Sequence, residues 1–229
     1  VTAYCKFETL VVAARYISSE QLECISPYPN SVAAVSVEVT MNDQQYTDEA
    51  MQFEYQAAAH VVLLAPSKGP MEGGSFVNVS GSDFAERSSA LSYLLCRFNM
   101  TAVPAEWISD IEVHCVSPEH AAGMVSVEVT LNNQQYTTDG IEFEYQDVVV
   151  TSIYPLSGPT AGATEVEVYG VNFYAPDSRE LFCKFGSANP VAAVYEGNHL
   201  ITCTTPAIPG GSPDVVAVHI FNNDAIYQS

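Results

Sequence analysis

Residues Cys183–Pro206 read CKFGSANPVAAVYEGNHLITCTTP, and the framework of this stretch occurs three times in the chain. In each copy a cysteine is followed by a basic residue and a phenylalanine. An aromatic residue lies eight positions before a second cysteine, and a proline lies three positions after it. The other two copies span Cys96–Pro118 and Cys5–Pro27. A framework that recurs at fixed positions indicates one structural module used three times.

A repeat of about ninety residues divides the 229-residue chain into small modules. Residues 57–146 hold a complete copy, which we name the second repeat. The first repeat, residues 1–56, lacks counterparts of the opening strands, and the third, residues 147–229, lacks a counterpart of the last strand, Ile141–Tyr145. We therefore expect a piece of a longer array, or neighbouring chains that fill both gaps. Short joins between the repeats predict a rod-like array with restricted motion.

The repeats show the two-residue periodicity of half-buried strands. In Val125–Leu131 the valines and the leucine alternate with polar residues, and Ser36–Met41 follows the same pattern. We expect the second repeat to have about seven short strands and no helix. In every repeat we expect a loop after the Cys-basic-Phe strand. This pattern predicts an all-β fold of tandem two-sheet sandwiches.

The cysteines come in one couple per repeat: Cys5 with Cys24, Cys96 with Cys115, and Cys183 with Cys203. This arrangement predicts one disulfide within each module, and closing a loop of that length stabilises a fold by about 3 kcal/mol. Disulfides persist in oxidising compartments, so we expect an extracellular or cell-surface location. Buried free thiols are the weaker alternative. Zinc ligation by the cysteines is a still weaker alternative, because the chain has no Cys-x-x-Cys and its histidines lack metal-ligand spacing.

The composition is strongly acidic, with seven basic residues, 27 acidic residues and a formal net charge of −20. This charge repels a phosphate backbone, so we do not expect the chain to bind nucleic acids. The plain explanation of the acidity is solubility. No run of about twenty apolar residues suggests a membrane span, and no signal peptide opens the chain.

A longer motif in the third repeat allows comparison with a known family. Thr151-x-Ile153-x-Pro155-x-x-Gly158-Pro159 is followed by Gly162, Gly170-x-Asn172-Phe173 and the two cysteine strands. This pattern resembles the IPT/TIG domain, an immunoglobulin-like fold found in plexins, transcription factors and large cell-surface proteins. The resemblance implies an early-set immunoglobulin-like sandwich whose cysteine pair is a disulfide in extracellular members. The second repeat departs from the motif at Asn99, and the first departs at Glu8 and lacks the opening motif.

No enzyme motif is found, and no cofactor or metal is expected. The many glutamates could suggest a carboxylate pair for glycoside cleavage, but most fall on the polar phase of predicted strands, which favours a solvated face. Tyr16, Trp107 and Tyr195 could stack on sugars, although their fixed offset from a cysteine favours packing against the disulfide. Turn propensity explains the acidic and amide-rich turns, with calcium as a minor alternative; these turns contain Asn42-Asp43, Asp48-Glu49, Asn132-Asn133, Asp139 and Asn222-Asn223-Asp224.

Two sequons predict N-glycans in a secretory protein. Asn99-Met100-Thr101 follows a cysteine strand, and Asn78-Val79-Ser80 places Asn78 out of phase with Val77 and Val79, at the position of Glu167 in the third repeat. Both asparagines are therefore expected to face solvent and accept a glycan.

The repeat pattern leads to a structural function. Our first hypothesis is a non-enzymatic component of an extracellular filament or surface fibre, self-associating through module ends or edges. The alternative is a receptor or adhesion ectodomain stalk that binds a protein ligand, which an exposed apolar patch confined to one repeat would favour. The third is a carbohydrate-binding module attached to an enzyme.

Overall fold

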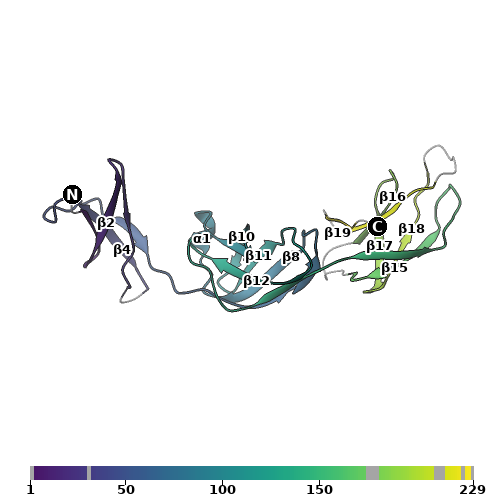
Figure 1. Cartoon of the computed structure of the whole chain (residues 1–229), viewed down its shortest axis with the longest axis horizontal. Helices are drawn as coiled ribbons and strands as arrows, with labels where there is room; N and C mark the ends of the chain where they lie inside the picture. Colours follow the sequence, from purple (N-terminus) through teal and green to yellow (C-terminus); the bar gives the residue numbers. More distant parts are fainter. Residues whose placement is uncertain (1–2, 30–31, 174–180, 209–214, 223–224, 228–229) are drawn as a thin grey trace. The chain divides into compact units, whose positions relative to one another are not determined.

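A computed structural model of the chain describes residues 3–29, 32–173, 181–208, 215–222 and 225–227. Contacts divide the chain into two compact units, residues 1–58 and 59–229, and each is described by itself. Nearly all regular structure is β, as Figure 1 shows. The predicted all-β, immunoglobulin-like fold is confirmed.

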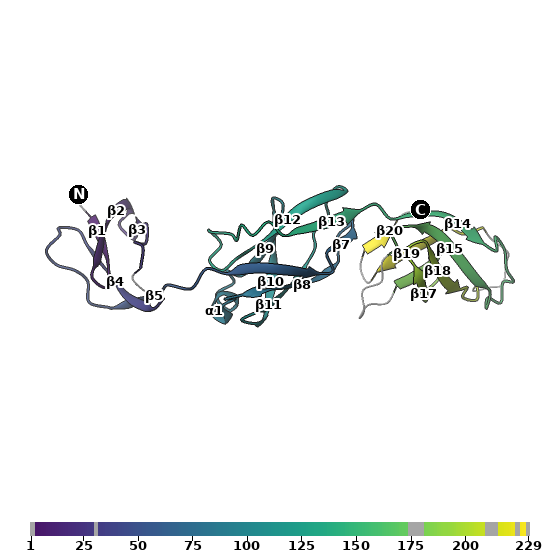
Figure 2. The same cartoon turned by 90° about the horizontal axis from the view of Figure 1, so that it is seen from below.

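The first repeat forms one antiparallel sheet (Figure 2). Its strands are β1 (Ala3–Phe7), β2 (Leu10–Ser18), β3 (Gln21–Cys24), β4 (Ala34–Thr40) and β5 (Met51–Glu54). Their spatial order is β3-β2-β1-β4-β5, so β3 and β5 form the edges of this sheet. On β1, Ala3, Cys5 and Phe7 are buried and alternate with half-buried Tyr4 and Lys6, as a two-residue period requires.

The second repeat has eight strands and one short helix. They are β6 (His60–Ala65), β7 (Lys68–Pro70), β8 (Phe76–Ser82), α1 (Glu86–Ala90), β9 (Leu95–Phe98), β10 (Thr101–Ser109), β11 (Glu112–Val116), β12 (Gly123–Thr130) and β13 (Glu142–Gln146). The strand order is β6-β8-β11-β10-β9-β12-β13-β7.

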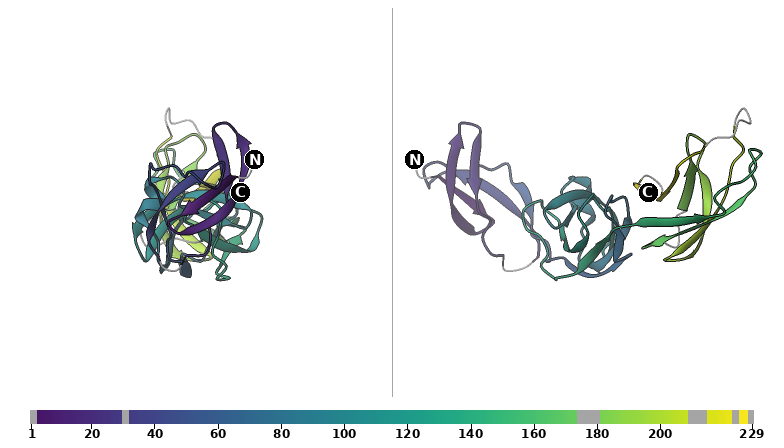
Figure 3. Two further views of the ribbon diagram at one scale, coloured as in Figure 1. Left: turned by 90° about the vertical axis from the view of Figure 1, so that its left-hand side faces the viewer. Right: turned by 45° about the vertical axis from the view of Figure 1, so that its right-hand side comes forward.

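One bent strand joins the two layers of this sandwich. The first half of β10, Thr101–Pro104, pairs with β9, while Ala105–Ser109 pairs with β11. The two halves therefore belong to different sheets, which enclose a core of apolar residues at most 6% exposed. Figure 3 gives a second view of these strands in blue and teal.

The third repeat is built on the same plan. Its strands are β14 (Val149–Tyr154), β15 (Glu165–Val171), β16 (Leu181–Phe185), β17 (Val191–Gly197), β18 (Leu200–Thr204), β19 (Val218–Asn222) and β20 (Ala225–Tyr227). Their order is β14-β15-β18-β17-β16-β19-β20, all antiparallel. The core centres on Val168, Cys183, Ile201 and Ile220, each 0% exposed.

The structure differs from the sequence prediction in four elements. The expected loop after each Cys-basic-Phe strand is mostly a strand: β2, β10 or β17. The expected turn at residues 66–74 contains β7, which pairs in parallel with β13. A short helix, α1, is present where none was expected. In the third repeat β20, which the sequence did not suggest, pairs with β19. Position 214 of the expected strand Asp214–Asn222 lies outside the described residues.

The glycine of the Gly-x-(Asp/Asn)-Phe motif is explained by close packing. A Cβ built on Gly170 would collide with the Val149 carbonyl oxygen and the ring of Phe173. In the second repeat a Cβ on Gly81 would likewise collide with the His60 carbonyl and lie 2.6 Å from the ring of Phe84. The motif therefore fixes a turn in which a buried phenylalanine lies against bare backbone.

Candidate functional site

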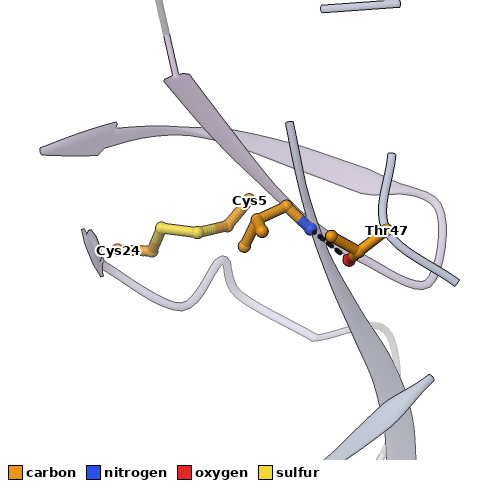
Figure 4. The surroundings of a disulfide bond; sticks show 4 residues. Cys5, Cys24 and Thr47 are labelled. Atoms are coloured by element: carbon orange, nitrogen blue, oxygen red, sulfur yellow. Dashed lines mark hydrogen bonds between the residues drawn. A yellow bond between two sulfur atoms is a disulfide. The ribbon is translucent and has the colours of Figure 1, made fainter. Parts of the chain in front are cut away.

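The six cysteines form three disulfides, one in each repeat. The bonds join Cys5 to Cys24, Cys96 to Cys115, and Cys183 to Cys203, with Cα–Cα distances of 6.2–6.4 Å. Each bond links the Cys-basic-Phe strand to the strand that precedes the proline found in every repeat, and Figure 4 shows the bond between Cys5 and Cys24. In the second repeat these strands, β9 and β11, belong to opposite sheets, so the disulfide crosses the core.

The disulfides of the second and third repeats are shielded from solvent. Cys96 and Cys183 are 0% exposed, and Cys115 and Cys203 are 1% exposed. In the first repeat Cys5 is 4% exposed and Cys24 is half-buried. Buried disulfides among valines and phenylalanines are structural staples, because no thiolate can reach them for exchange.

The aromatic residues that precede the second cysteines do not all pack as expected. Trp107 packs against the core, and its indole Nε1 donates a hydrogen bond to the Phe84 carbonyl at 2.9 Å. Tyr195 is 40% exposed, and its hydroxyl donates to the Phe173 carbonyl at 3.4 Å. Tyr16 is 52% exposed. The expectation of burial against the disulfide is therefore wrong for the tyrosines. In the second and third repeats this aromatic residue anchors the Gly-x-(Asp/Asn)-Phe turn instead.

The amide-rich turns hold themselves together through side chains. Asn132 Oδ1 accepts hydrogen bonds from the amides of Gln134 and Gln135, both at 3.0 Å, and Asn42 makes the same bonds to Gln44 and Gln45. This is the asparagine turn geometry that replaces backbone pairing. No cluster of three or more His, Cys, Asp or Glu side chains suited to a metal occurs among the described residues, and Asn223 and Asp224 lie outside them.

A threonine after each of these turns ties the loop back to the preceding strand. Thr47 Oγ1 accepts a hydrogen bond from the Val39 amide at 3.0 Å, drawn as a dashed line in Figure 4. Thr137 Oγ1 makes the same bond with Val129 at 3.0 Å. The near-identical sequences NDQQYT and NNQQYT thus have a structural explanation.

Two glutamates on the polar phase form ion pairs across strands. Lys6 Nζ lies 2.9 Å from Glu38, and Arg97 Nε donates to Glu128 at 2.9 Å. The Arg97 guanidinium also stacks over the ring of Tyr136, 3.8 Å from its centroid. These glutamates are therefore partners of a basic residue and are not paired with a second carboxylate.

One clamp was not predicted from the sequence. The Asp139 carboxylate accepts hydrogen bonds from His60 Nδ1 at 2.9 Å and from the Val61 amide at 2.7 Å, which ties the start of β6 to the β12–β13 loop. These bonds raise the pKa of His60 and lower the pKa of Asp139. The sequence places Asp139 only in an acidic turn, because its hydrogen-bond partners lie 78 and 79 positions away.

The two sequons lie in different settings. Asn99 is exposed in the tight turn between β9 and β10, with φ of 55°, and its Nδ2 lies 3.1 Å from His120 Nε2. Asn78 is half-buried on β8, opposite Ala65 on one side and His114 on the other. Glycosylation at both positions stays a prediction.

The outer face of the β14-β15-β18-β17 sheet differs between repeats. Three large side chains are exposed there: Tyr154 (68%), Tyr169 (38%) and Val194 (59%). The equivalent positions of the second repeat are Ala65, Ser80 and Glu106. We name the third-repeat surface, which also contains Glu165, Glu167 and Thr202, the tyrosine face. It is an exposed aromatic patch that the second repeat lacks.

None of the described helices is long and apolar enough to cross a membrane. An extracellular or cell-surface location, as predicted, fits the three disulfides and the similarities that follow.

Among curated proteins, the chain is 24% identical to plexin A3 of Danio rerio over 206 residues and 25% identical to plexin-A2 of Mus musculus over 207, in each case over 86% of this chain. It is 23% identical to fibrocystin-L of Mus musculus over 210 residues, or 90% of this chain. The chain spans only 10% of each plexin and 5% of fibrocystin-L.

Two crystal structures of the plexin A4 extracellular region have a similar fold. The TM-scores are 0.56 and 0.57, with 14% and 17% identity. The matches cover 100% and 96% of this chain, and 30% and 20% of those chains. The family model described as IPT/TIG domain matches residues 60–145 and again residues 149–229. These matches account for most of the sequence, and the chain belongs to the IPT/TIG domain family.

Proposed function

We propose that this chain is a non-catalytic segment of the extracellular stalk of a cell-surface receptor or adhesion protein. Its similarity to plexins along 86% of its length carries the proposal. The disulfides and tight turns of the described residues stabilise the fold. Glu38 and Glu128, which could suggest a catalytic carboxylate pair, form ion pairs with Lys6 and Arg97 instead. Of our sequence hypotheses, this is the alternative rather than the first.

The tyrosine face adds support for a ligand-binding role within such a stalk. Monomeric proteins rarely expose large contiguous apolar patches without a use for them. A scaffold of equal modules needs no surface that only one module carries. Tyr154, Tyr169 and Val194 replace Ala65, Ser80 and Glu106, so the third repeat presents a surface that the second lacks.

Sedimentation velocity of the secreted chain over a wide concentration range tests the stalk against the filament. A stalk segment is expected to stay monomeric, with a sedimentation coefficient independent of concentration apart from ordinary non-ideality. Growth of larger species through module ends or edges would instead support self-association into a filament, which stays a prediction, and would overturn the stalk proposal.

A further inference from the structure

The tyrosine face combines aromatic rings with carboxylates in alternating positions. Glu165, Glu167 and Tyr169 point outward from β15, because Val166 and Val168 between them are buried. In the strand register Tyr154 lies opposite Glu167 on one side, and Thr202 lies opposite it on the other. Rings and carboxylates are thus neighbours across three strands.

Hydrogen bonding fixes the central pair of this surface. The Tyr169 hydroxyl donates to Glu167 Oε2 at 2.6 Å, which raises the pKa of Tyr169 and keeps this group a donor. Glu167 has a second carboxylate oxygen for another donor. Glu165, one step along the strand, is exposed.

The four strands of the tyrosine face carry no basic residue. Their sequences are VVTSIY, EVEVYGV, LITCT and VAAVYEG. Two glutamates on strands of the other repeats have a cation beside them: Arg97 pairs with Glu128 and Lys6 pairs with Glu38. The tyrosine face therefore presents negative charge and aromatic rings without a cation on its own strands.

The chain itself shows which group this combination recognises. In the second repeat a guanidinium stacks on the ring of Tyr136 and donates to the carboxylate of Glu128. A planar guanidinium satisfies both demands at once, since it stacks on aromatic faces and donates several hydrogen bonds in a fixed fork. A tyrosine beside a glutamate is therefore suited to bind an arginine side chain.

We propose that the tyrosine face is a docking surface for a protein partner that presents arginine side chains flanked by apolar residues. Tyr154 and Tyr169 stack on the guanidinium groups, Glu165 and Glu167 accept their hydrogen bonds, and Val194 supplies an apolar margin. The net charge of −20 favours approach of a basic partner. This inference rests on the proposed stalk function and names the chemistry of its ligand.

The same face of the second repeat is unsuited to this partner. Asn78 replaces Glu167, and the sequon there predicts a glycan that would cover the sheet. His114 lies beside Asn78 in the register and packs edge-on against Phe76, with ring centroids 4.7 Å apart. Docking is therefore assigned to the third repeat.

The test is a nuclear magnetic resonance titration of the full chain with a blocked peptide that alternates arginine and valine. A twin peptide carries citrulline, the uncharged analogue, in place of arginine. We expect the arginine peptide to shift resonances of β14, β15, β17 and β18, and the citrulline peptide to bind more weakly. Tyr154→Ala should weaken arginine-peptide binding about two- to fivefold, and Glu165→Gln with Glu167→Gln should remove the preference over citrulline.

Two matched variants serve as controls. Tyr28→Ala removes a tyrosine that is 94% exposed in the first repeat, and Glu119→Gln removes an exposed carboxylate in the second. Neither should change the affinity. Equal binding of both peptides, shifts spread over acidic surfaces and insensitive to Tyr154→Ala, or no shifts at large peptide excess would each overturn the proposal. So would a neutral glucan oligosaccharide that shifts these strands while the peptide does not.

These outcomes are independent of the sedimentation test. A monomeric chain that ignores the arginine peptide would leave the stalk function standing and remove only the docking surface. A chain that forms filaments would overturn the stalk whatever the peptide does.

Discussion

At the scale of single residues, the glycine of the Gly-x-(Asp/Asn)-Phe turn has no room for a side chain. We predict that Gly170→Ala lowers the free energy of unfolding of the third repeat by about 2 kcal/mol, because the new methyl group collides with the Val149 carbonyl and the Phe173 ring. Urea unfolding followed by circular dichroism measures this change. Gly197→Ala in the same repeat is the control, because a Cβ there meets nothing within 4 Å. Equal stability of the two variants would contradict the packing argument.

The His60–Asp139 clamp should depend on pH. The Asp139 bond raises the pKa of His60, so the stabilisation is complete below the unfolded pKa of histidine and is lost as pH rises through the raised value. The pKa of Asp139 is lowered, so its part is present above the unfolded pKa of aspartate and is lost as pH falls through the lowered value. The clamp is strongest between these limits, at mildly acidic pH.

We therefore expect Asp139→Asn to return the pKa of His60 towards the ordinary histidine range. Nuclear magnetic resonance titration of the His60 ring in the two proteins measures the shift. The His199 ring, whose Nδ1 lies 3.1 Å from a backbone carbonyl, is a control that should be unaffected by the substitution. An unchanged His60 titration would show that the clamp does not form in solution.

The two sequons should differ in occupancy. Asn99 lies in an exposed turn, whereas Asn78 is half-buried between β6 and β11, so we expect more glycan at Asn99 in the secreted protein. Peptide mass spectrometry after enzymatic deglycosylation in heavy-oxygen water counts the modified fraction. Asn189, which lies in Asn-Pro-Val and so has no Ser or Thr two positions later, should stay unmodified. Unmodified asparagine at both sequons would refute the prediction.

At the scale of elements, Trp107 connects β10 to the turn that follows β8. Trp107→Phe keeps an aromatic ring but removes the hydrogen bond from Nε1 to the Phe84 carbonyl, so the free energy of unfolding should fall by about 1 kcal/mol. Chemical unfolding followed by circular dichroism measures the loss. Tyr16→Phe alters the same repeat position where the side chain is 52% exposed, and should change stability little. If both substitutions change the free energy of unfolding equally, the hydrogen bond from Trp107 to the Phe84 carbonyl does not stabilise the fold.

Elements with a local signature were the predictable ones. The Cys-basic-Phe strands and alternating stretches such as Val125–Leu131 were found from the sequence, since side-chain alternation is visible there. β10 contains Pro104, which argues against a strand, and β10 tolerates it where the strand passes from one sheet to the other. β7 depends on a parallel partner far along the chain, so no neighbouring residue reveals it.

The candidate site was predictable to a similar extent. The cysteine couples and the sequons are readable from spacing alone. The tyrosine face was not, because Tyr154, Tyr169 and Val194 come from three strands and meet only through the strand register. The expected burial of Tyr195 is wrong because its hydroxyl reaches the Phe173 carbonyl from the surface, while Tyr16 is simply exposed at 52%.

At the scale of the whole molecule, the connection between the second and third repeats leaves no free spacer. The Gln146 carbonyl accepts a hydrogen bond from the Met71 amide at 3.1 Å, and the Asp147 carbonyl accepts one from Asn172 Nδ2 at 2.7 Å. Val148 is already part of the third core, at 6% exposure. Each connecting residue is thus held by one repeat or the other.

We predict that the two repeats tumble together and that Asn172→Gly loosens them. Glycine tolerates the φ of 62° at this position, so the substitution removes only the side-chain bond. Residual dipolar couplings should give matching alignment tensors for the two repeats in the unmodified chain and diverging ones in the variant. Asp83→Gly, at the equivalent position with φ of 61°, is the control. Mismatched tensors in the unmodified chain would contradict a stiff connection.

The disulfide within each repeat also limits how far a pulled module can lengthen. When tension unravels a repeat, the residues between its two cysteines stay enclosed in a loop, and sequence separations of 19 and 20 remove about 65 Å of extension per repeat. A string of such modules would therefore yield to a pulling force in short steps, each shortened by the enclosed loop.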